Sequence, residues 1–312
     1  MQIKDYITFN FFLVQSRLRK ILSNFISLFL FFPIFFCSCQ NDQEHTISGS
    51  TKIKNDSIVN IKFSALSDSI YTIPWKNKTR KVVCRAADSA KGTILLLPGW
   101  NFAPDEWCTK MDFCVKAKEA GYNLIMPDML KSMYAVEYYK QTRKDFFESP
   151  TRKWVNDTLI PYFQKVFGIF LKEQNNFVCG ISTGGRGSVL IAMDNPDIFK
   201  KGVSMSGDFN PLSMKKDNLL NLYYGPYDKF KKRWENSDNA FLRINDLKMP
   251  FFLFHGESDK VVPPAQSIDF YKESVSKKNN FIKLKMVKSA GHNYKFWNSQ
   301  TTEIIQFFQS SK

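Results

Sequence analysis

The chain has 312 residues, of which 44% are hydrophobic, 15% aromatic and 23% charged. This composition excludes a disordered polymer and is typical of a globular protein with a sizeable core, in one large domain or two small ones. The net charge is +15, but the basic residues are spread along the chain and accompany no recognisable nucleic-acid motif. We therefore interpret the charge mostly as a solvated surface and expect no nucleic-acid partner.

The first forty residues predict an export signal. Residues 1–20 carry four basic side chains and one acidic one, and the run 21–36, ILSNFISLFLFFPIFF, is almost wholly apolar. Small residues follow it, which is the order of a secretory signal peptide. A membrane-spanning signal anchor is the alternative, but the run is shorter than the roughly 20 residues that a span needs, and it contains Pro33.

The end of this signal resembles the lipobox of bacterial lipoproteins. In FCSC, Ser38 occupies the small position before the cut and Cys39 the lipidated position, although Phe36 departs from the usual Leu. The resemblance implies that residues 1–38 are removed and that acyl chains, palmitate among them, attach Cys39 to a membrane. The protein is then expected in the bacterial cell envelope, lipid-anchored to the outer membrane and facing either the periplasm or the cell surface.

Polar residues 39–60 lack periodicity and predict a flexible tether. From residue 61 to residue 312, short apolar runs alternate with longer amphipathic ones, which predicts one α/β domain with a doubly wound, mostly parallel sheet. An aromatic, irregular stretch, 208–249, is expected to be an insertion before the acid-bearing strand, either a lid or an ordinary loop. Strands are predicted at 71–75, 81–86, 93–100, 122–128, 176–180, 201–207, 250–256 and 281–288. Helices are predicted at 104–120, 151–173, 185–195, 265–278 and 299–311.

Four cysteines follow the lipidation segment. Cys108 and Cys114 fall six residues apart on one predicted helix, too far apart for a disulfide within it. Cys84 and Cys179 sit in apolar runs and are expected to be small buried hydrophobes. No pairing is predicted from the sequence. No Cys/His cluster with metal-ligand spacing is present either, so we expect no metal site.

The stretch Gly180-Ile181-Ser182-Thr183-Gly184 stands between a predicted strand and a predicted helix. A nucleophile elbow needs a serine on a sharp turn and tiny residues two positions away on either side. Glycine-rich turns without chemistry also exist, but the flanking strand and helix favour Ser182 as a nucleophile.

A serine nucleophile needs a base, and the chain has three histidines. His45 lies in the tether, and His255 lies in an apolar strand end, where a buried structural histidine is expected. His292 follows the last predicted strand on a small-residue loop, so we predict that it is the base.

The base needs an orienting carboxylate. We favour Asp259, just past a strand in FHGESDKVVP, over Glu257 and, more distantly, Asp208. The oxyanion needs two N–H donors. The backbone N–H of Thr183 is one candidate, and the second is the N–H of Trp100, with Asn101 as an alternative. The order Ser182, Asp259, His292 is typical of α/β-hydrolases.

From about residue 81 to its end, the chain resembles the α/β-hydrolase superfamily. GISTGGRGSVLIAMDNPDIFKKGVSMSGDFNP is similar to the branch of esterase-D-like, feruloyl and acetyl-xylan esterases, whereas HGESDKVVPPAQSIDFY and SAGH resemble the catalytic domain of prolyl-oligopeptidase-type peptidases. The sequence departs from the pattern of these families at two positions. Pro98 stands where the families often have His, and Thr183 stands where they commonly have Met or Gln.

The resemblance implies a serine esterase that cleaves small or carbohydrate-linked esters through an acyl-enzyme and needs no cofactor. A serine peptidase is the first alternative, against which the chain has no room for the large propeller domain of many such enzymes. A non-catalytic binding lipoprotein is the second. The presence of all three residues of the Ser-Asp-His set favours catalysis.

Overall fold

The computed structural model describes residues 63–146 and 152–311, all of which belong to one compact unit, Asn60–Lys312. The predicted signal peptide, Cys39, His45 and the tether lie outside the described residues. Within the described part of the chain, no helix is both long and apolar enough to cross a membrane.

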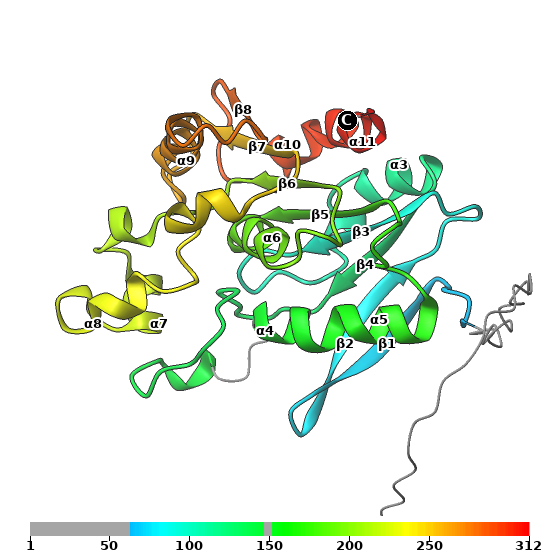
Figure 1. The fold of residues 1–312 in the computed structure, drawn as a ribbon, viewed down its shortest axis with the longest axis horizontal. Helices are drawn as coiled ribbons and strands as arrows, with labels where there is room; N and C mark the ends of the chain where they lie inside the picture. Colours follow the sequence, from blue (N-terminus) through cyan, green and yellow to red (C-terminus); the bar gives the residue numbers. More distant parts are fainter. Residues whose placement is uncertain (1–62, 147–151, 312) are drawn as a thin grey trace, which may run out of the picture. The chain divides into compact units, whose positions relative to one another are not determined.

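The described residues form an eight-stranded sheet in the order β1-β2-β4-β3-β5-β6-β7-β8 (Figure 1). Strand β2 is antiparallel to both of its neighbours, and the other pairs are parallel. The doubly wound, mostly parallel sheet predicted from the sequence is therefore confirmed. The strands are β1 Ser69–Trp75, β2 Lys78–Arg85, β3 Gly92–Leu97, β4 Tyr122–Pro127, β5 Asn176–Ile181, β6 Lys201–Met205, β7 Phe251–Gly256 and β8 Ile282–Val287.

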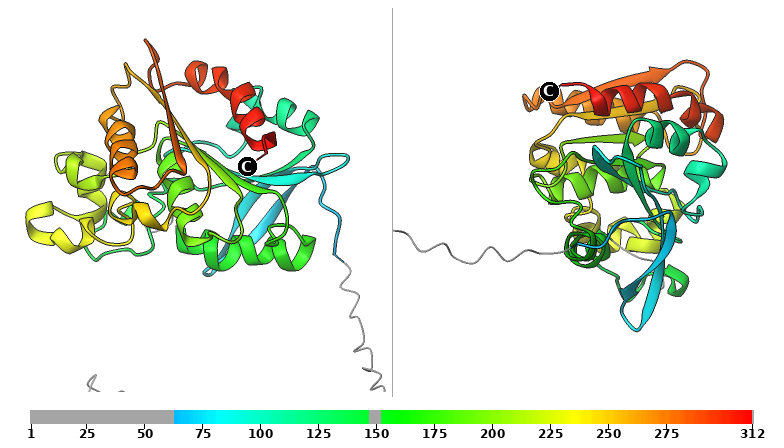
Figure 2. Two further views of the ribbon diagram at one scale, coloured as in Figure 1. Left: turned by 45° about the horizontal axis from the view of Figure 1, so that its top comes forward. Right: turned by 90° about the vertical axis from the view of Figure 1, so that its right-hand side faces the viewer.

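Helices cover both faces of the sheet (Figure 2). Side chains alternate between the two faces, since successive residues of a strand point in opposite directions. On β3, for example, Leu95 and Leu97 pack on one face, and Ile94 and Leu96 on the other. The first face is covered by α4 Arg152–Trp154, α5 Ile160–Phe167, α6 Thr183–Asp194 and α9 Ala265–Ser276. The second is covered by α2 Glu106–Thr109, α3 Phe113–Glu119, α10 Tyr294–Ser299 and α11 Thr301–Gln309.

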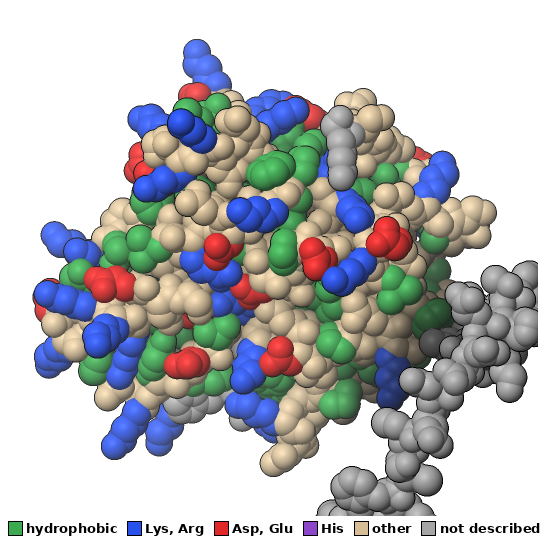
Figure 3. Space-filling model, in the orientation of Figure 1, with side chains coloured by type: hydrophobic (Ala, Val, Ile, Leu, Met, Phe, Trp, Pro, Cys, Tyr) green, Lys and Arg blue, Asp and Glu red, His purple; other side chains and the backbone are tan. Residues whose placement is uncertain are grey.

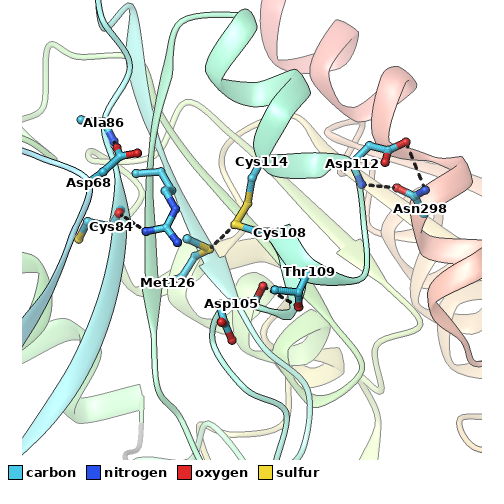
Figure 4. Close-up of a disulfide and its surroundings, with 11 residues drawn as sticks. Asp68, Cys84, Ala86, Asp105, Cys108, Thr109, Asp112, Cys114, Met126 and Asn298 are labelled. Carbon is cyan, nitrogen blue, oxygen red and sulfur yellow. Dashed lines mark hydrogen bonds between the residues drawn. A yellow bond between two sulfur atoms is a disulfide. The ribbon is translucent and has the colours of Figure 1, made fainter.

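The single helix predicted over 104–120 is wrong, and so is the exclusion of a disulfide there. The chain turns between α2 and α3, and Cys108 and Cys114 form a disulfide with their Cα atoms 5.0 Å apart (Figure 4). Six residues of a continuous helix would rise about 9 Å, beyond the reach of a disulfide. At the turn, the backbone N–H of Asp112 donates to Asn298 Oδ1 at 2.8 Å, so the start of α3 is joined to α10.

The predicted helix 151–173 is shorter and is interrupted. A π-helical turn, Val155–Leu159, lies between α4 and α5 and ends two residues before Pro161, and the helix ends at Gly168 in the left-handed conformation. Proline removes an N–H donor and clashes with the carbonyl four residues earlier, which accounts for the wider turn.

The predicted insertion is present between β6 and β7 and contains α7 Asn218–Tyr224, α8 Tyr227–Trp234 and the 3₁₀ turns Pro211–Met214 and Phe241–Asp246. Its aromatic side chains form a separate small core with residues 133–146, which follow β4, and with Trp100, which follows β3. Parallel strands end at the same edge of a sheet, so this small core lies at the carboxyl edge, where functional groups of such folds gather. We call residues 206–250 the insertion below.

Candidate active site

Ser182 stands at the sharp turn from β5 into α6. Its backbone has φ 57° and ψ −126°, a combination that a residue with a side chain adopts only at a cost. A side chain at Gly180 would overlap the carbonyl oxygen of Gly184, and one at Gly184 would overlap the carbonyl of Leu97 on β3. Both glycines are therefore needed for α6 to start this close to β3 and β5.

The structure brings the three predicted triad residues together from three separate loops. His292 Nε2 lies 2.9 Å from Ser182 Oγ, and His292 Nδ1 lies 2.7 Å from Asp259 Oδ2. Trp297 packs edge-on against the imidazole, with ring centroids 5.1 Å apart. The serine, imidazole and carboxylate thus form one continuous hydrogen-bonded chain in which the imidazole faces the other two groups through different nitrogens.

Among the three candidate carboxylates, only that of Asp259 reaches His292. Glu257 is exposed, whereas Asp259 is buried. Asp208 is buried too, but it pairs with Arg186 at 3.0 Å. Burial alone would raise the pKa of Asp259. Hydrogen bonds from His255 and His292 outweigh this effect and hold its pKa well below the ordinary range, so Asp259 is ionised beside the imidazole.

His255 is buried, as the sequence predicts, and supports the acid loop. Its Nδ1 lies 2.7 Å from Ser267 Oγ, and its Nε2 lies 3.1 Å from the carbonyl of Val262 and 3.4 Å from Asp259 Oδ2. Because a carbonyl can only accept, Nε2 carries the proton and the Ser267 hydroxyl donates to Nδ1. His255 and His292 therefore both face the same oxygen of the carboxylate, Asp259 Oδ2.

The loop after β3 lies against Ser182, since a side chain at Gly99 would come within 3.1 Å of Ser182 Cβ. The N–H of Asn101 donates to the carbonyl of Leu130 at 2.9 Å, so it is occupied. Within the described part of the chain, the N–H groups of Trp100 and Thr183 have no hydrogen-bond partner. Of the two sequence candidates in this loop, Trp100 therefore has the available donor.

Two buried side chains that hold this site were missed by the sequence analysis. Tyr134, from the loop after β4, donates to the carbonyl of Pro98 at 2.8 Å and so holds the turn before Trp100. Arg186, one turn after Ser182, pairs with Asp208 and donates to Tyr224 Oη at 2.7 Å. Neither residue lies in a recognisable motif, and a buried arginine is rare enough that sequence alone places it on the surface.

The described residues hold no cluster of His, Cys, Asp and Glu side chains with the geometry of a metal site. The groups around Ser182 are instead the imidazole of His292 with the Asp259 carboxylate behind it, and the N–H groups of Thr183 and of Trp100 in the adjoining loop. This is the set that nucleophilic acyl transfer uses.

Residues 159–310 match the prolyl oligopeptidase family. No curated protein sequence is significantly similar to the chain.

Several solved structures share the fold at low identity. The fluorophosphonate-binding serine hydrolase FphF of Staphylococcus aureus is 16% identical with a TM-score of 0.63, over 78% of this chain and 97% of that one. A ferulic acid esterase is 17% identical with a TM-score of 0.58, over 77% and 96%. A protein described as a dipeptidyl aminopeptidase IV from Bacteroides ovatus is 16% identical with a TM-score of 0.58, over 77% of this chain but 35% of that one.

The fold is the α/β-hydrolase fold, as predicted. The family match and the structural neighbours together support a serine hydrolase of this type.

Proposed function

We propose that this protein is a serine esterase with Ser182 as nucleophile, His292 as general base and acid, and Asp259 as the carboxylate that orients the imidazole. The observation that carries the proposal is the unbroken Ser182–His292–Asp259 hydrogen-bonded chain, with distances of 2.9 and 2.7 Å. Its geometry supports proton transfer from the serine hydroxyl to Nε2 while Nδ1–H remains bonded to a carboxylate.

In this mechanism, Ser182 Oγ attacks the ester carbonyl carbon and His292 Nε2 takes its proton. The N–H groups of Trp100 and Thr183 donate to the oxyanion, each worth roughly 3 kcal/mol in the transition state. The C–O bond to the alcohol then breaks, and His292 returns the proton to the leaving oxygen. Water then attacks the acyl carbon and gives a proton to His292 Nε2. The bond from the acyl carbon to Ser182 Oγ breaks, His292 passes the proton to Oγ, and the carboxylic acid leaves.

We favour an ester over a peptide bond as the substrate, because the chain matches esterases over nearly their whole length and a peptidase over only part of its length. The chain covers nearly all of FphF and of the ferulic acid esterase, but about a third of the dipeptidyl aminopeptidase. The prolyl oligopeptidase match keeps a peptidase as the second candidate. We propose small or carbohydrate-linked esters as substrates.

We also propose that the protein acts in the bacterial cell envelope, held to the membrane by acyl chains on Cys39. The FCSC segment motivates this placement. The Cys108–Cys114 disulfide supports it independently, because disulfides persist in exported proteins and are rare in the reducing cytosol.

The test is labelling with a fluorophosphonate probe, followed by turnover of short acyl esters, acylated sugars and peptide amides. Ser182→Ala should abolish labelling and turnover with an unchanged thermal midpoint, whereas Ser258→Ala, an exposed serine next to Asp259, should retain both. Labelling that survives in Ser182→Ala would place the nucleophile elsewhere. Turnover of peptide amides but not esters would favour the peptidase.

A further inference from the structure

A pocket of about 430 Å³ lies between the insertion and the loop that carries Asp259. The insertion contributes residues 212–217, and the acid loop contributes Val261 and Pro263. The N–H of Val261 donates to Asp259 Oδ1 at 2.9 Å, so this wall of the pocket belongs to the same turn that positions the carboxylate. The pocket is therefore adjacent to the loop of the proposed catalytic acid.

The two walls of this pocket are joined by a buried amide. Gln266, at the start of α9 and only 3% exposed, accepts from the backbone N–H groups of Phe209 and Asn210, both at 2.8 Å. Its Nε2 donates to Ser213 Oγ at 2.7 Å, inside the pocket wall. These bonds fix the start of the insertion against the first turn of α9, directly after the acid loop, so this wall of the pocket is held in place without a ligand.

The lining combines apolar surface with positive charge. Leu212 and Met214 are half-buried, and Val261 is 63% exposed, so all three present apolar surface to the pocket. Lys215 and Lys216 are exposed at the rim, and neither forms an ion pair among the described residues.

The lining contains one further charged side chain, that of Asp217, which caps a helix. Asp217 Oδ1 accepts from the N–H of Leu220 at 2.9 Å and so caps α7. Lys215 Nζ stands 3.9 Å above the ring of Tyr227, which holds the ammonium group beside the pocket. In Figure 3, Lys and Arg side chains gather over α7 and α8 on the left of the molecule, so the surroundings of the pocket add to its positive potential.

We propose that this pocket is a substrate subsite for a carboxylate carried on a short apolar stem. This inference rests on the proposed esterase function and names the class of ester that the site prefers: one with an anionic group a few carbons away from the scissile bond. The stem lies against Leu212, Met214 and Val261, and the carboxylate is bound by Lys215 and Lys216.

The test compares matched neutral and anionic esters. On the acyl side the pair is 4-nitrophenyl butyrate and 4-nitrophenyl hemisuccinate, and on the alcohol side it is phenyl acetate and 4-carboxyphenyl acetate. The measured quantity is the ratio of kcat/KM for the anionic ester to that for the neutral ester. It is determined for the wild type, for Lys215→Met/Lys216→Met, and for the control Lys231→Met/Lys232→Met, which removes the same charge from α8 outside the pocket lining.

In one of the two pairs, the ratio should fall about five- to tenfold in the pocket variant and stay within about twofold of the wild type in the control, since half-exposed charge pairs contribute modestly. An unchanged neutral-ester rate shows that the variant is folded. If the ratio is unchanged in both pairs, or falls equally in the control, the subsite is wrong while the esterase function stands. If the wild type hydrolyses peptide amides but none of the four esters, the proposed function is wrong, and the proposed subsite is wrong with it.

Discussion

The carboxylate of Asp259 is held by four groups at once. Its Oδ1 accepts from the N–H groups of Val261 and Val262, both at 2.9 Å, and its Oδ2 faces both His292 and His255. This saturation fixes the carboxylate orientation and keeps it ionised, so that it can hold one imidazole tautomer and stabilise the imidazolium.

Replacing this carboxylate should damage catalysis far more than binding. Asp259→Asn should lower kcat by orders of magnitude, about 10⁴-fold in the reference Ser-His-Asp triad, with little change in KM. Glu257→Gln should change either constant little, because Glu257 is exposed and does not contact the imidazole. Steady-state kinetics on one ester measure both. A crippled Glu257→Gln beside a nearly wild-type Asp259→Asn would refute the acid assignment and leave the hydrolase proposal intact.

At the scale of elements, the α2–α3 pair joins the loop after β3, which carries Trp100, to the loop that carries His292. The disulfide closes the turn between the two helices, and Cys108 Sγ lies 3.7 Å from Met126 Sδ of β4. Glu106 on α2 accepts a hydrogen bond from Tyr294, two residues beyond His292. The disulfide thus stabilises a part of the fold that packs next to the proposed active site.

Removing the disulfide should lower the free energy of unfolding by about 2 kcal/mol, the chain-entropy value for so short a loop. Chemical denaturation of Cys108→Ser/Cys114→Ser should show this loss with or without reductant. Reduction of the wild type should produce the same loss. The double variant keeps Cys84 and Cys179, which are buried and unpaired, so any effect of reductant on these two thiols would appear in the variant as well. A wild type whose midpoint does not respond to reductant, and matches that of the double variant, would contradict a structural disulfide.

At the scale of the whole unit, the two sheet faces carry separate apolar cores, and the carboxyl edge carries a third one formed by the insertion. Arg186 connects these parts, because it lies on α6, pairs with Asp208 after β6 and donates to Tyr224 on α7. Removing one partner of a buried ion pair typically costs 3–5 kcal/mol, so Arg186 ties the insertion to α6 at Asp208 and Tyr224.

The location of the whole molecule is tested at Cys39. Cys39→Ala should move the protein out of the membrane fraction or leave its signal peptide uncleaved, and should abolish incorporation of labelled palmitate, because Cys39 is the proposed site of acylation. Cys37→Ala, two residues away in the same segment, is the control and should remain in the membrane fraction. A mature N-terminus far from Cys39 without acyl chains, measured by mass spectrometry, would refute the lipid anchor.

The positions of all eight strands, the insertion between β6 and β7 and the candidates Ser182 and His292 follow from the sequence alone. These features have local causes. Apolar runs and turn residues identify the strands, and the elbow needs glycines at fixed offsets from the serine. Of the three histidines, His45 lies in the predicted tether and His255 in an apolar strand, which leaves His292 as the base.

Tertiary structure decided the rest, because it depends on which groups meet across the chain. Glu257 and Asp259 are two residues apart in the same motif, and only burial against His255 and His292 distinguishes them. The disulfide required a turn that helix periodicity did not predict and that a bond to Asn298, 186 residues away, stabilises. Arg186 is buried because its charge meets Asp208 in space, and a pairing of that kind leaves no local pattern in the sequence.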